Sequence, residues 1–544
     1  MCWPGGACWP AGIPCGRSCE RFRRAGPRER TQLEREVTVL ERPRLPLGDY
    51  YQLLLKSGLL ADLRPLPIDL TRTISAVTCD SRGAVPGSLF VCKGASFRAE
   101  YLAEAVRRGT AAYVSERPYD GIPAPCIPVT DIRRAMGLLA DRAWGHPSGA
   151  LRVVGITGTK GKTTTAYFLK AILDDWRQAE GLPPVGLLST IVTDDGVQRR
   201  PAVLTTPEPL DLQRHLWNAA GAGCGYVVME ESSQALKYGR VIGVELAAAV
   251  FLNIGEDHIS PREHPTFEDY FASKLKIFDQ AETAVVNLDS DRAGQVLAAA
   301  RRCGRVLTYS MADPAADLFG GDLTRTEEGL AFTVRGLGEA LRCTIPMTGD
   351  FNVSNALAAL AVCRALGVPA EAVRTGLARA KVPGRMEACS AGGKTVIVDY
   401  AHNGMSLSAL LRSVRGDYPG APVTAVFGCT GGKGLDRRAD MGAAAGAYAD
   451  RIILTEDDPG PETVEDICAE IAAAAAPYGK PCAVIPDREE AVRTAIREAP
   501  VPGVVVLAGK GSEGQQKRKN GPEPCVPDGL LARKYLGLPL DGAV

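Results

Sequence analysis

A glycine-rich stretch at residues 155–163, GITGTKGKT, carries the side chains whose chemistry is easiest to name. We align it with the phosphate-binding pattern G-x-x-x-x-G-K-[ST], taking Gly155 and Gly161 as its glycines, Lys162 as its lysine and Thr163 as its hydroxyl residue. In such a loop, backbone N–H groups and the N-terminus of the following helix surround the phosphates. The lysine reaches the β- and γ-phosphates, and the hydroxyl binds Mg²⁺. The stretch predicts a nucleoside triphosphate site but not the use of the phosphate; a chance glycine turn is the alternative.

Two further stretches hold candidates for binding the metal that accompanies such a nucleotide. Glu230 and Glu231 follow an apolar, strand-like run, and a carboxylate beside a phosphate loop is a natural Mg²⁺ ligand. Because neighbouring side chains of an extended chain point in opposite directions, only one of them can face the nucleotide. His258 also follows a strand-like run, and a neutral imidazole can bind a metal. A pair of solvated glutamates and a structural histidine are the alternatives.

Arg385 and His402 lie close to a stretch at 381–384 that could link two domains. From there, Arg385 could stabilise a phosphoryl group during transfer when the domains close. An interdomain salt bridge is the alternative role for this arginine. Lys274, considered alone, is typical of an exposed lysine on a helix.

The elements that would position these residues alternate between strand and helix, which indicates an α/β protein. Around the phosphate loop we expect a strand at 151–156, a helix at 164–175, and further strands at 226–229, 247–253 and 284–287. This alternation predicts a central, doubly wound and mostly parallel sheet.

The last part of the chain alternates in the same way and predicts a Rossmann-like sheet. Its expected strands are 395–398, 423–427, 451–454 and 504–507, and its expected helices are 406–415, 439–449 and 464–475. Each of these strands is followed by a polar loop. Ligands of open α/β sheets bind at the carboxyl ends of the strands, so the four loops predict one wall of an active site.

A length of 544 residues is too great for one hydrophobic core, and three domains are expected after a disordered extension at 1–45. We place a small α/β domain at 46–149, which opens with a helix at 49–63. The central domain would occupy 150–383, and the last domain 384–544.

The composition is that of a soluble globular protein, and it narrows the range of partners. The 63 basic and 63 acidic residues give a net charge of zero, so no overall field attracts nucleic acid or an anionic membrane. No apolar run approaches the 18 residues that a spanning helix needs. Twelve of the sixteen cysteines are scattered without metal-ligand spacing, which favours reduced thiols in a cytoplasmic protein. The other four lie in the first twenty residues, where a zinc knuckle is the alternative to disorder. We expect a monomer.

Taken together, these stretches resemble the Mur ligases, and among them the UDP-MurNAc-tripeptide synthetases. The resemblance spans about residues 46–540 and consists of short motifs in the family's order. The motifs are DSR at 80–82, PGSLF at 86–90, GTKGKT at 158–163, TTP at 205–207, Glu230 with Ser232 and Ser233, Arg240, DH at 257–258, Lys274, Asn352 with Asn355, GRME at 384–387, DYAH at 399–402 and GKG at 509–511.

The resemblance implies a role for each motif. Ser81 and its neighbours would hold the uridine end of UDP-MurNAc-L-Ala-D-Glu in the first domain. The muramoyl-dipeptide end would be held by Thr205, Thr206, Ser232 and Arg240. ATP would be bound by Gly158, Thr159, Lys160, Gly161, Lys162, Thr163, Thr164, Asn355, Arg385, Asp399 and His402. Mg²⁺ would be bound by Thr163, Glu230, His258 and Lys274, and the residues acting in catalysis would be Lys162, His258, Lys274 and Arg385.

The same resemblance implies a reaction. ATP phosphorylates the γ-carboxylate of D-Glu to an acyl phosphate, the amine of a free amino acid attacks it, and phosphate leaves. Lys274 would carry a carbamate formed with CO₂, because a lysine cation would repel Mg²⁺ whereas a carbamate is an anionic oxygen ligand. Forming it requires a neutral amine, so the site must lower the lysine pKa.

The amino acid that is added is read from the third-domain loops. Family members that add meso-diaminopimelate usually show Asp-Asn-Pro-Arg, and this chain has DDPG at 457–460, without the arginine that would pair with a distal carboxylate. Asp457 and Asp458 would instead favour a distal ammonium. Gly509 and Glu513 belong to the same site, with Ser512 where the family has histidine. The stretches 159–162, 263–270 and 399–404 also resemble the lysine-adding branch. We expect L-lysine; diaminopimelate stays open, because Lys433 or Arg437 could supply a substitute cation.

Two other functions would fit part of the pattern. One is a related amide ligase, such as folylpolyglutamate synthase, cyanophycin synthetase or another Mur enzyme, although the DSR domain argues against the first two. The other is a regulatory protein that binds a nucleotide without ligase activity.

Overall fold

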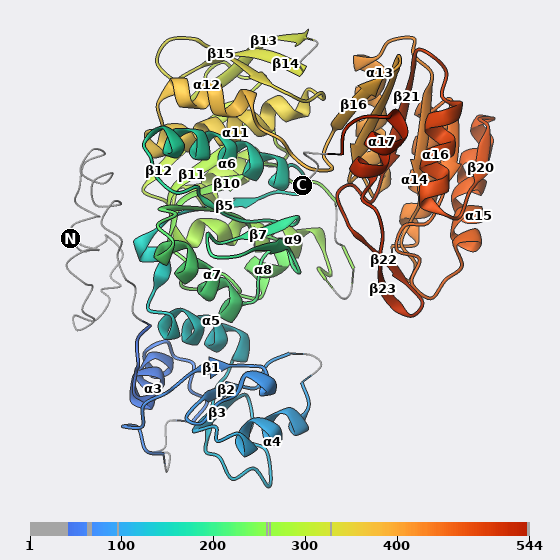
Figure 1. The fold of residues 1–544 in the computed structure, drawn as a ribbon. Coiled ribbons are helices and arrows are strands. Elements are labelled where there is room, and N and C mark those ends of the chain that lie inside the picture. Colours follow the sequence, from blue (N-terminus) through green and yellow to red (C-terminus); the bar gives the residue numbers. More distant parts are fainter. Residues whose placement is uncertain are drawn as a thin grey trace.

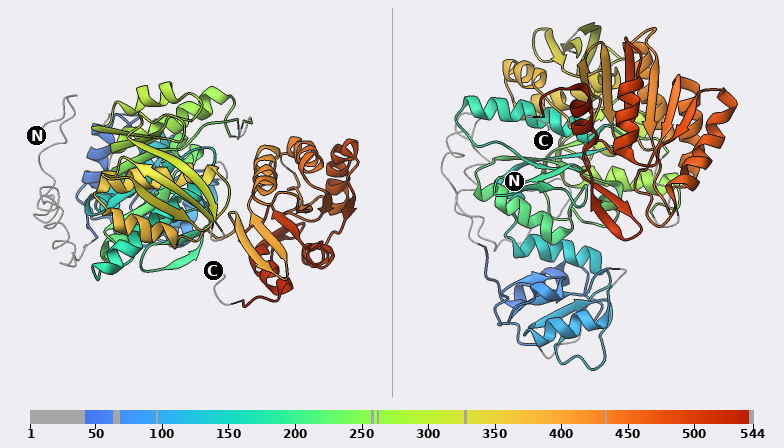
Figure 2. Two further views of the ribbon diagram at one scale, coloured as in Figure 1. Left: turned by 90° about the horizontal axis from the view of Figure 1, so that it is seen from above. Right: turned by 45° about the vertical axis from the view of Figure 1, so that its right-hand side comes forward.

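The computed structural model describes residues 42–62, 68–94, 97–256, 259–260, 263–326, 329–432 and 434–540. Its main sheets follow one another along the chain and form three units (Figure 1). The first unit lies at one end of the central one, and the third lies beside the central one as a separate lobe (Figure 2). The α/β class and the mostly parallel central sheet that the sequence predicts are confirmed.

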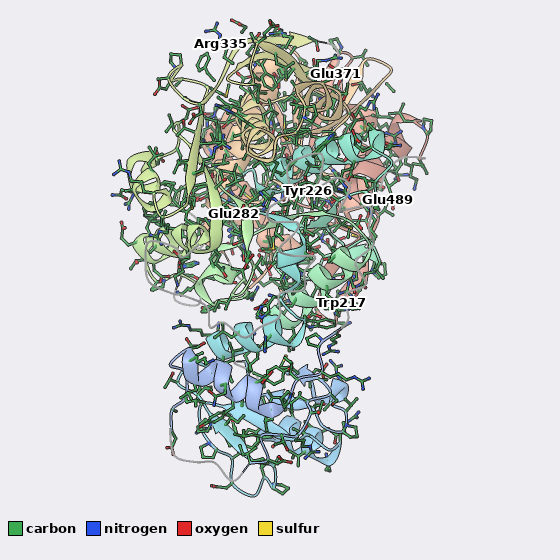
Figure 3. The ribbon with its side chains drawn as sticks, turned by 90° about the vertical axis from the view of Figure 1, so that its left-hand side faces the viewer. Trp217, Tyr226, Glu282, Arg335, Glu371 and Glu489 are labelled. Atoms are coloured by element: carbon green, nitrogen blue, oxygen red, sulfur yellow. The ribbon has the colours of Figure 1, made fainter. Side chains whose placement is uncertain are left out.

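The first unit is a small parallel sheet covered by helices. Its strands run in the order β1 (Val77–Thr78), β2 (Leu89–Val91), β3 (Ala112–Ser115) and β4 (Cys126–Pro128). Its helices are α3 (Leu47–Lys56), α4 (Ala99–Arg107) and α5 (Ile132–Ala143). The helix expected at 49–63 therefore ends earlier, because Gly58 takes a left-handed conformation, with φ of 66°, that stops it. Trp144, at the end of α5, packs on Trp217 of the central unit (labelled in Figure 3) with 5.6 Å between ring centroids and joins the two units.

The central unit is built on a sheet of eleven described strands whose middle is parallel. In spatial order they are β15 (Leu341–Ile345), β14 (Gly329–Arg335), β13 (Leu318–Thr326), β12 (Arg305–Ser310), β11 (Ala281–Asn287), β10 (Leu246–Phe251), β5 (Arg152–Thr157), β9 (Tyr226–Glu230), β6 (Gly186–Leu188), β7 (Val192–Asp194) and β8 (Arg199–Pro201). Both edges are antiparallel: β13–β15 form one and β6–β8 the other.

Helices cover both faces of this sheet, as the period of two along a strand requires. Val154 and Ile156 of β5 belong to one core and Val153 to the other. The helices of the first face are α6 (Lys162–Ala179), α11 (Phe351–Leu366) and α12 (Ala370–Ala378). Those of the second face are α7 (Pro209–Gly221), α8 (Ser233–Lys237), α9 (Phe267–Leu275) and α10 (Ala293–Ala300).

The third unit is a six-stranded sheet with one antiparallel edge strand. Its order is β16 (Glu387–Ala391), β17 (Lys394–Asp399), β21 (Gly503–Ala508), β18 (Val423–Phe427), β19 (Arg451–Leu454) and β20 (Cys482–Val484). One face carries α13 (Gly404–Asp417), α14 (Asp436–Tyr448) and α15 (Val464–Ala475), and the other carries α16 (Arg488–Glu498) and α17 (Asp528–Leu536). A two-stranded arm, β22 (Gln515–Arg518) and β23 (Gly521–Pro524), extends from this sheet (Figure 1).

Two expectations from composition can be compared with the described residues. Their cysteines are free thiols, most of them buried in the cores. None of their helices is both long enough and apolar enough to cross a bilayer.

Candidate active site

The phosphate loop joins β5 to α6, as the sequence predicts, but its glycines do not have the assumed spacing. Five residues separate Gly155 from Gly161, and Ile156 stands where the strict pattern has its first glycine. Gly155 lies inside β5 rather than in the loop. Gly161 caps α6 with φ of 86°, and a Cβ there would overlap the side chain of Asn355 on α11. The alignment is therefore corrected: Gly158 and Gly161 shape the loop, and Gly155 does not.

Two lysines converge on one carbonyl of this loop. Lys162 Nζ donates to Gly158 O at 2.8 Å, and Lys274 Nζ donates to the same oxygen at 2.9 Å. Lys274 lies on α9 and is 1% exposed, with Nζ 4.7 Å from the centroid of the Tyr270 ring. It is therefore not the exposed helix lysine that the residue alone suggested, and it reaches the wall of the same cavity as Lys162.

Glu230 and Glu231 point in opposite directions, as expected for consecutive residues at the end of a strand. Glu230 accepts hydrogen bonds from the Thr163 hydroxyl at 3.1 Å and from the backbone N–H of Thr190 at 2.9 Å, and it lines the cavity. Glu231 is 1% exposed, and neither of its carboxyl oxygens has a hydrogen-bond partner. Burial raises the pKa of Glu231 to about 8. Of the two glutamates, only Glu230 therefore faces the phosphate loop.

The residues present around Thr163 suit a magnesium ion. The Thr163 hydroxyl and the Glu230 carboxylate are hard oxygen donors, and a carbamate on Lys274 would supply another. Clusters of three or more His, Cys, Asp or Glu side chains that could hold a metal are absent from the described residues. His258, the remaining predicted ligand, lies outside them. The fit therefore depends on the Thr163 and Glu230 oxygens, with the nucleotide, water and a modified lysine completing the coordination of Mg²⁺.

A cavity of about 620 Å³ lies between the central and third units, within the size range of small-molecule sites. The predicted residues that line it are Thr159, Lys160, Gly161, Lys162, Thr163, Thr164, Thr205, Glu230, Ser232, Arg240, Lys274, Asn355, Arg385, Asp399 and His402. They come from both units, so the cavity is shared between the phosphate loop and the loop that follows β17.

The wall from the third unit is cationic and partly desolvated. Arg385 lies over the ring of Tyr400, at 4.8 Å from its centroid. Burial, followed by the nearby Lys160, lowers the pKa of His402 to about 4, so its imidazole is neutral at pH 7. Its Nδ1 lies 2.9 Å from Tyr400 O. Burial also raises the pKa of Asp399, which accepts a hydrogen bond from the backbone N–H of Met386.

The predicted substrate threonines have different surroundings. Thr205 lines the cavity, whereas Thr206 is fully buried; its hydroxyl donates to Glu230 O at 2.8 Å and accepts from Ser232 N at 3.0 Å. Arg240 donates to Thr206 O at 3.2 Å and pairs with Glu208 at 3.0 Å. Thr206 therefore shapes the wall that Ser232 and Arg240 present.

Ser81 lies far along the chain from this cavity, in a 3₁₀ turn (Ser81–Gly83) of the first unit, and does not line it. A second cavity of about 170 Å³ lies between the first and central units. Its lining includes Lys93, Arg133, Glu208 and Arg240, so Arg240 lines both cavities. The sequence argument missed Lys93 and Glu208, although Lys93 follows β2 at the carboxyl end of a parallel strand, where ligands are expected.

The third-unit loops hold ion pairs rather than open charges. Lys510 is 1% exposed and donates to Asp458 at 2.9 Å and to Glu513 at 2.8 Å. Lys517 also pairs with Asp458, at 3.1 Å. Asp457 is buried, and burial raises its pKa to about 7 against the opposing charge of Arg488. These loops do not line the 620 Å³ cavity, but the Tyr400 hydroxyl, whose residue does, donates to Glu513 at 2.6 Å.

The remaining residues named from the sequence are a glycine and two candidate cations of the third unit. Gly509 follows β21, and a Cβ there would overlap the side chain of Asp457. Lys433, a candidate cation for a distal carboxylate, lies outside the described residues, and Arg437 is half-buried. Tyr270 and Tyr400, which line the cavity beside Lys274 and Arg385, were not predicted. Aromatic residues three or four positions before Lys274 on a helix were the available signal.

Comparisons with known proteins agree with this geometry. Residues 156–363 match the Mur ligase middle domain, and residues 384–511 match the glutamate ligase domain of the Mur ligases. The UDP-N-acetylmuramoyl-L-alanyl-D-glutamate--L-lysine ligase of Enterococcus faecalis is 38% identical over 86% of this chain and 92% of that protein. The ligase of that name from Streptococcus pneumoniae is 36% identical over 85% and 92%.

Solved structures show the same fold. A UDP-N-acetylmuramoyl-L-alanyl-D-glutamate--2,6-diaminopimelate ligase matches with a TM-score of 0.64 and 25% identity, over 91% of this chain and 99% of that one. MurF from Acinetobacter baumannii matches over the same shares, with a TM-score of 0.59 and 21% identity. Because the sequence likeness extends along most of the chain and includes both sides of the cavity, the chain belongs to the Mur ligase family.

Proposed function

We propose that this protein is an ATP-dependent ligase that adds L-lysine to the D-Glu of UDP-MurNAc-L-Ala-D-Glu, in cytoplasmic peptidoglycan precursor synthesis. The observation that carries the proposal is the shared cavity. It brings a phosphate loop, a carboxylate beside a hydroxyl, and a buried lysine to one face, and an arginine and a neutral histidine to the other. The names of the relatives at 36–38% identity support the same reaction.

The nucleotide would bind along the phosphate loop, with Lys162 leaving Gly158 O to reach the terminal phosphates. The N–H groups at the start of α6 would bind phosphate oxygens. Thr163, Glu230 and Lys274 as a carbamate, with His258, would hold Mg²⁺, which offsets the charge between ATP and the attacking carboxylate. The burial of Lys274 against the loop supports this assignment, because it holds Nζ beside the cavity that Thr163 and Glu230 also line.

The acceptor would lie across both cavities. Its uridine end would be held near Ser81, and Arg240 and Ser232 would hold the muramoyl-dipeptide so that the D-Glu γ-carboxylate meets the γ-phosphate of ATP. Arg385 would stabilise the phosphoryl group in transfer, and Asn355, Asp399 and His402 would complete the nucleotide site. A carboxylate oxygen would form a C–O–P acyl phosphate with the γ-phosphorus of ATP as the bond from that phosphorus to ADP breaks, and ADP would leave. The amine of the second substrate then forms the amide bond, and phosphate leaves.

The choice of L-lysine rests on the loop that follows β19. Gly460 stands where diaminopimelate-adding members of the family have an arginine, so the described residues lack that partner for a distal carboxylate. Asp457, Asp458, Gly509 and Glu513 would form the amino-acid site. Asp458 is already paired with two lysines and Glu513 with Lys510, so an arriving ammonium would share these carboxylates or meet Asp457.

Purified protein supplied with ATP, Mg²⁺ and UDP-MurNAc-L-Ala-D-Glu tests the proposal, with each amino acid offered separately. We expect phosphate release that requires both the muramoyl dipeptide and L-lysine, and a product heavier by one lysyl residue. Faster turnover with meso-diaminopimelate would contradict the choice of L-lysine and leave the proposed ligase activity in place. Nucleotide binding without any substrate-dependent phosphate release would support a binding protein instead.

A further inference from the structure

Three residues beside the cavity form a continuous hydrogen-bonded chain that the roles above do not use. His264 Nε2 lies 3.0 Å from Ser233 Oγ, and His264 Nδ1 lies 2.6 Å from Asp269 Oδ2. Ser233 is 4% exposed and lines the cavity together with Thr163 and Lys274. His264 is completely buried behind it. This order of hydroxyl, imidazole and carboxylate is the arrangement that makes a serine hydroxyl a proton acceptor.

The three residues come from separate elements whose packing fixes their geometry. Ser233 opens α8 immediately after the loop that follows β9, His264 lies in the segment before α9, and Asp269 is in the first turn of α9. The Thr266 hydroxyl caps α9 by accepting from Asp269 N. Because α8 packs against α9, the chain of hydrogen bonds is part of the interface between the two helices.

The charges around Asp269 decide which proton lies where. Lys237 Nζ donates to the same Asp269 oxygen at 2.7 Å, and that bond, followed by the one from His264, lowers the pKa of Asp269. An ionised carboxylate at Nδ1 requires Nδ1 to carry a proton. The neutral imidazole then has a bare Nε2, which accepts the Ser233 hydroxyl proton. Ser233 Oγ therefore presents lone pairs to the cavity and can accept a proton from a bound N–H group.

The proposed reaction needs such an acceptor. An amino acid carries its amine as an ammonium at neutral pH, and an ammonium has no lone pair with which to attack an acyl phosphate. We propose that Ser233, His264 and Asp269 remove this proton, an inference that rests on the ligase function proposed above. One ammonium N–H bond breaks as its proton passes to Ser233 Oγ, and the Ser233 hydroxyl proton passes to His264 Nε2. The amine then forms the C–N bond as the C–O bond to phosphate breaks, a second amine proton leaves with the phosphate, and the imidazolium is stabilised by Asp269.

The groups facing His264 both support and limit its charge. Asp269 favours the imidazolium, whereas Lys237 opposes it. The ring of Tyr270 packs edge-on against the imidazole at 5.2 Å between centroids, and Glu263 lies next to His264 along the chain and lines the cavity. The proton is therefore held transiently, which suits a relay that must return it to solvent in each cycle.

The test compares two nucleophiles in the full-length enzyme with ATP, Mg²⁺ and UDP-MurNAc-L-Ala-D-Glu. L-Lysine arrives as an ammonium, whereas hydroxylamine is uncharged at neutral pH and attacks acyl phosphates without losing a proton first. For Ser233→Ala we expect a loss of about 100-fold in kcat with L-lysine, the size of a general-base contribution. Hydroxamate formation with hydroxylamine should stay within a few-fold of the unsubstituted enzyme. Asp269→Asn should show the same selective loss.

Ser273→Ala is the matched control, because Ser273 is another buried serine on α9 whose hydroxyl donates only to the backbone oxygen of Asp269 among the bonds described. It should change neither reaction. Equal losses with both nucleophiles, or no loss with L-lysine, would overturn the relay.

A pH series separates the relay from a packing defect even if hydroxylamine fails to react. The lysine rate of Ser233→Ala should recover as the pH rises and solvent deprotonates the amine, whereas a packing defect would persist. Failure of the unsubstituted enzyme to turn over would count against the ligase function rather than against the relay.

Discussion

The two sides of the active site, the phosphate loop and the loops of the third sheet, manage charge in opposite ways. At the phosphate loop the main interactions are with the backbone. Gly161 takes a left-handed conformation, and two lysines donate hydrogen bonds to one carbonyl oxygen. At the third sheet, side chains balance one another, as in the pairing of Lys510 with Asp458 and Glu513. A loop that binds phosphate through its backbone can be recognised in the sequence from its glycines. A set of mutually paired charged side chains has no comparable sequence pattern.

The difference follows from the ligands that the two regions would receive. A phosphate carries several negative charges, and N–H groups and cations can meet them in any sequence that allows the turn. A free amino acid brings charges of both signs, so its site must be near neutral in total. The third-sheet loops meet this need by pairing most of their charges in advance and by keeping Asp457 at a raised pKa of about 7.

The largest effect is expected from breaking the phosphate side. Lys162→Ala removes the cation that would reach the terminal phosphates, and we expect substrate-dependent phosphate release to fall about 1000-fold. We expect the variant to fold, because the hydrogen bonds described for Lys162 go to carbonyls of its own loop, those of Gly158 and Thr159. Phosphate release measured with both substrates present decides the matter, and a loss below tenfold would contradict the assigned role.

Substitutions of the two neighbouring glutamates test the same side of the site, with one variant as the control for the other. Glu230→Gln removes a carboxyl group that would bind Mg²⁺, and we expect about a 100-fold loss of kcat, together with a higher Mg²⁺ concentration for half-maximal activity. Glu231→Gln is the control one residue away: its side chain points into the core, so the Mg²⁺ dependence should not move. Similar shifts in both variants would mean that the orientation of the two side chains is wrong.

Breaking the third-sheet side should have a smaller and more selective effect. Lys510→Met leaves Asp458 and Glu513 without their shared buried partner, and we expect a loss of about 3 kcal/mol in the free energy of unfolding. The KM for L-lysine should rise at least tenfold, whereas the KM for ATP should change little. Urea unfolding and separate KM measurements test the two statements; an equal rise in both KM values would remove the distinction between the two regions.

The last test concerns the pH dependence of stability rather than activity. The pKa of Glu231 is raised by burial from 4.5 to about 8, so the folded protein holds a proton that the unfolded chain has released. Stability is therefore unaffected below pH 4.5 and falls as the pH rises from there to about 8, by up to ~1.4 kcal/mol for each pH unit. Glu231→Met should flatten this slope in urea unfolding measured between pH 5 and 8. An unchanged slope would show that the carboxyl is not buried as described.

The parts of the fold that could be predicted are those in which one residue pattern determines one element. The expected strands 423–427 and 451–454 and the helix 464–475 have the observed bounds, because each is a compact apolar or amphipathic run. The edge strands β13–β15 were missed, since 318–345 mixes glycine and charge and its pairing is set by contacts with neighbouring strands.

The site divides in the same way. Glycine, lysine and threonine in the phosphate loop identify themselves, and the prediction that one glutamate faces it is confirmed. The alternation of side chains along the strand could not say which one, because that depends on how β9 is placed in the sheet, whereas the family resemblance had pointed to Glu230. Nor could it bring together Ser233, His264 and Asp269, whose association depends on the packing of α8 against α9. The solvated-pair interpretation of Glu230 and Glu231 is wrong, since both are buried.

Gly155, which the sequence alignment assigned to phosphate binding, constrains how this sequence can change. A Cβ at this position would overlap Glu231 Oε1 and lie 2.9 Å from Leu246 Cδ1. Alanine at 155 therefore requires the ends of the Glu231 and Leu246 side chains to shift, and it should be tolerated better after position 231 has lost its carboxyl group. The effects of the two substitutions are therefore coupled, although neither residue faces the nucleotide. A core contact behind the phosphate loop thus limits the order in which these two positions can change.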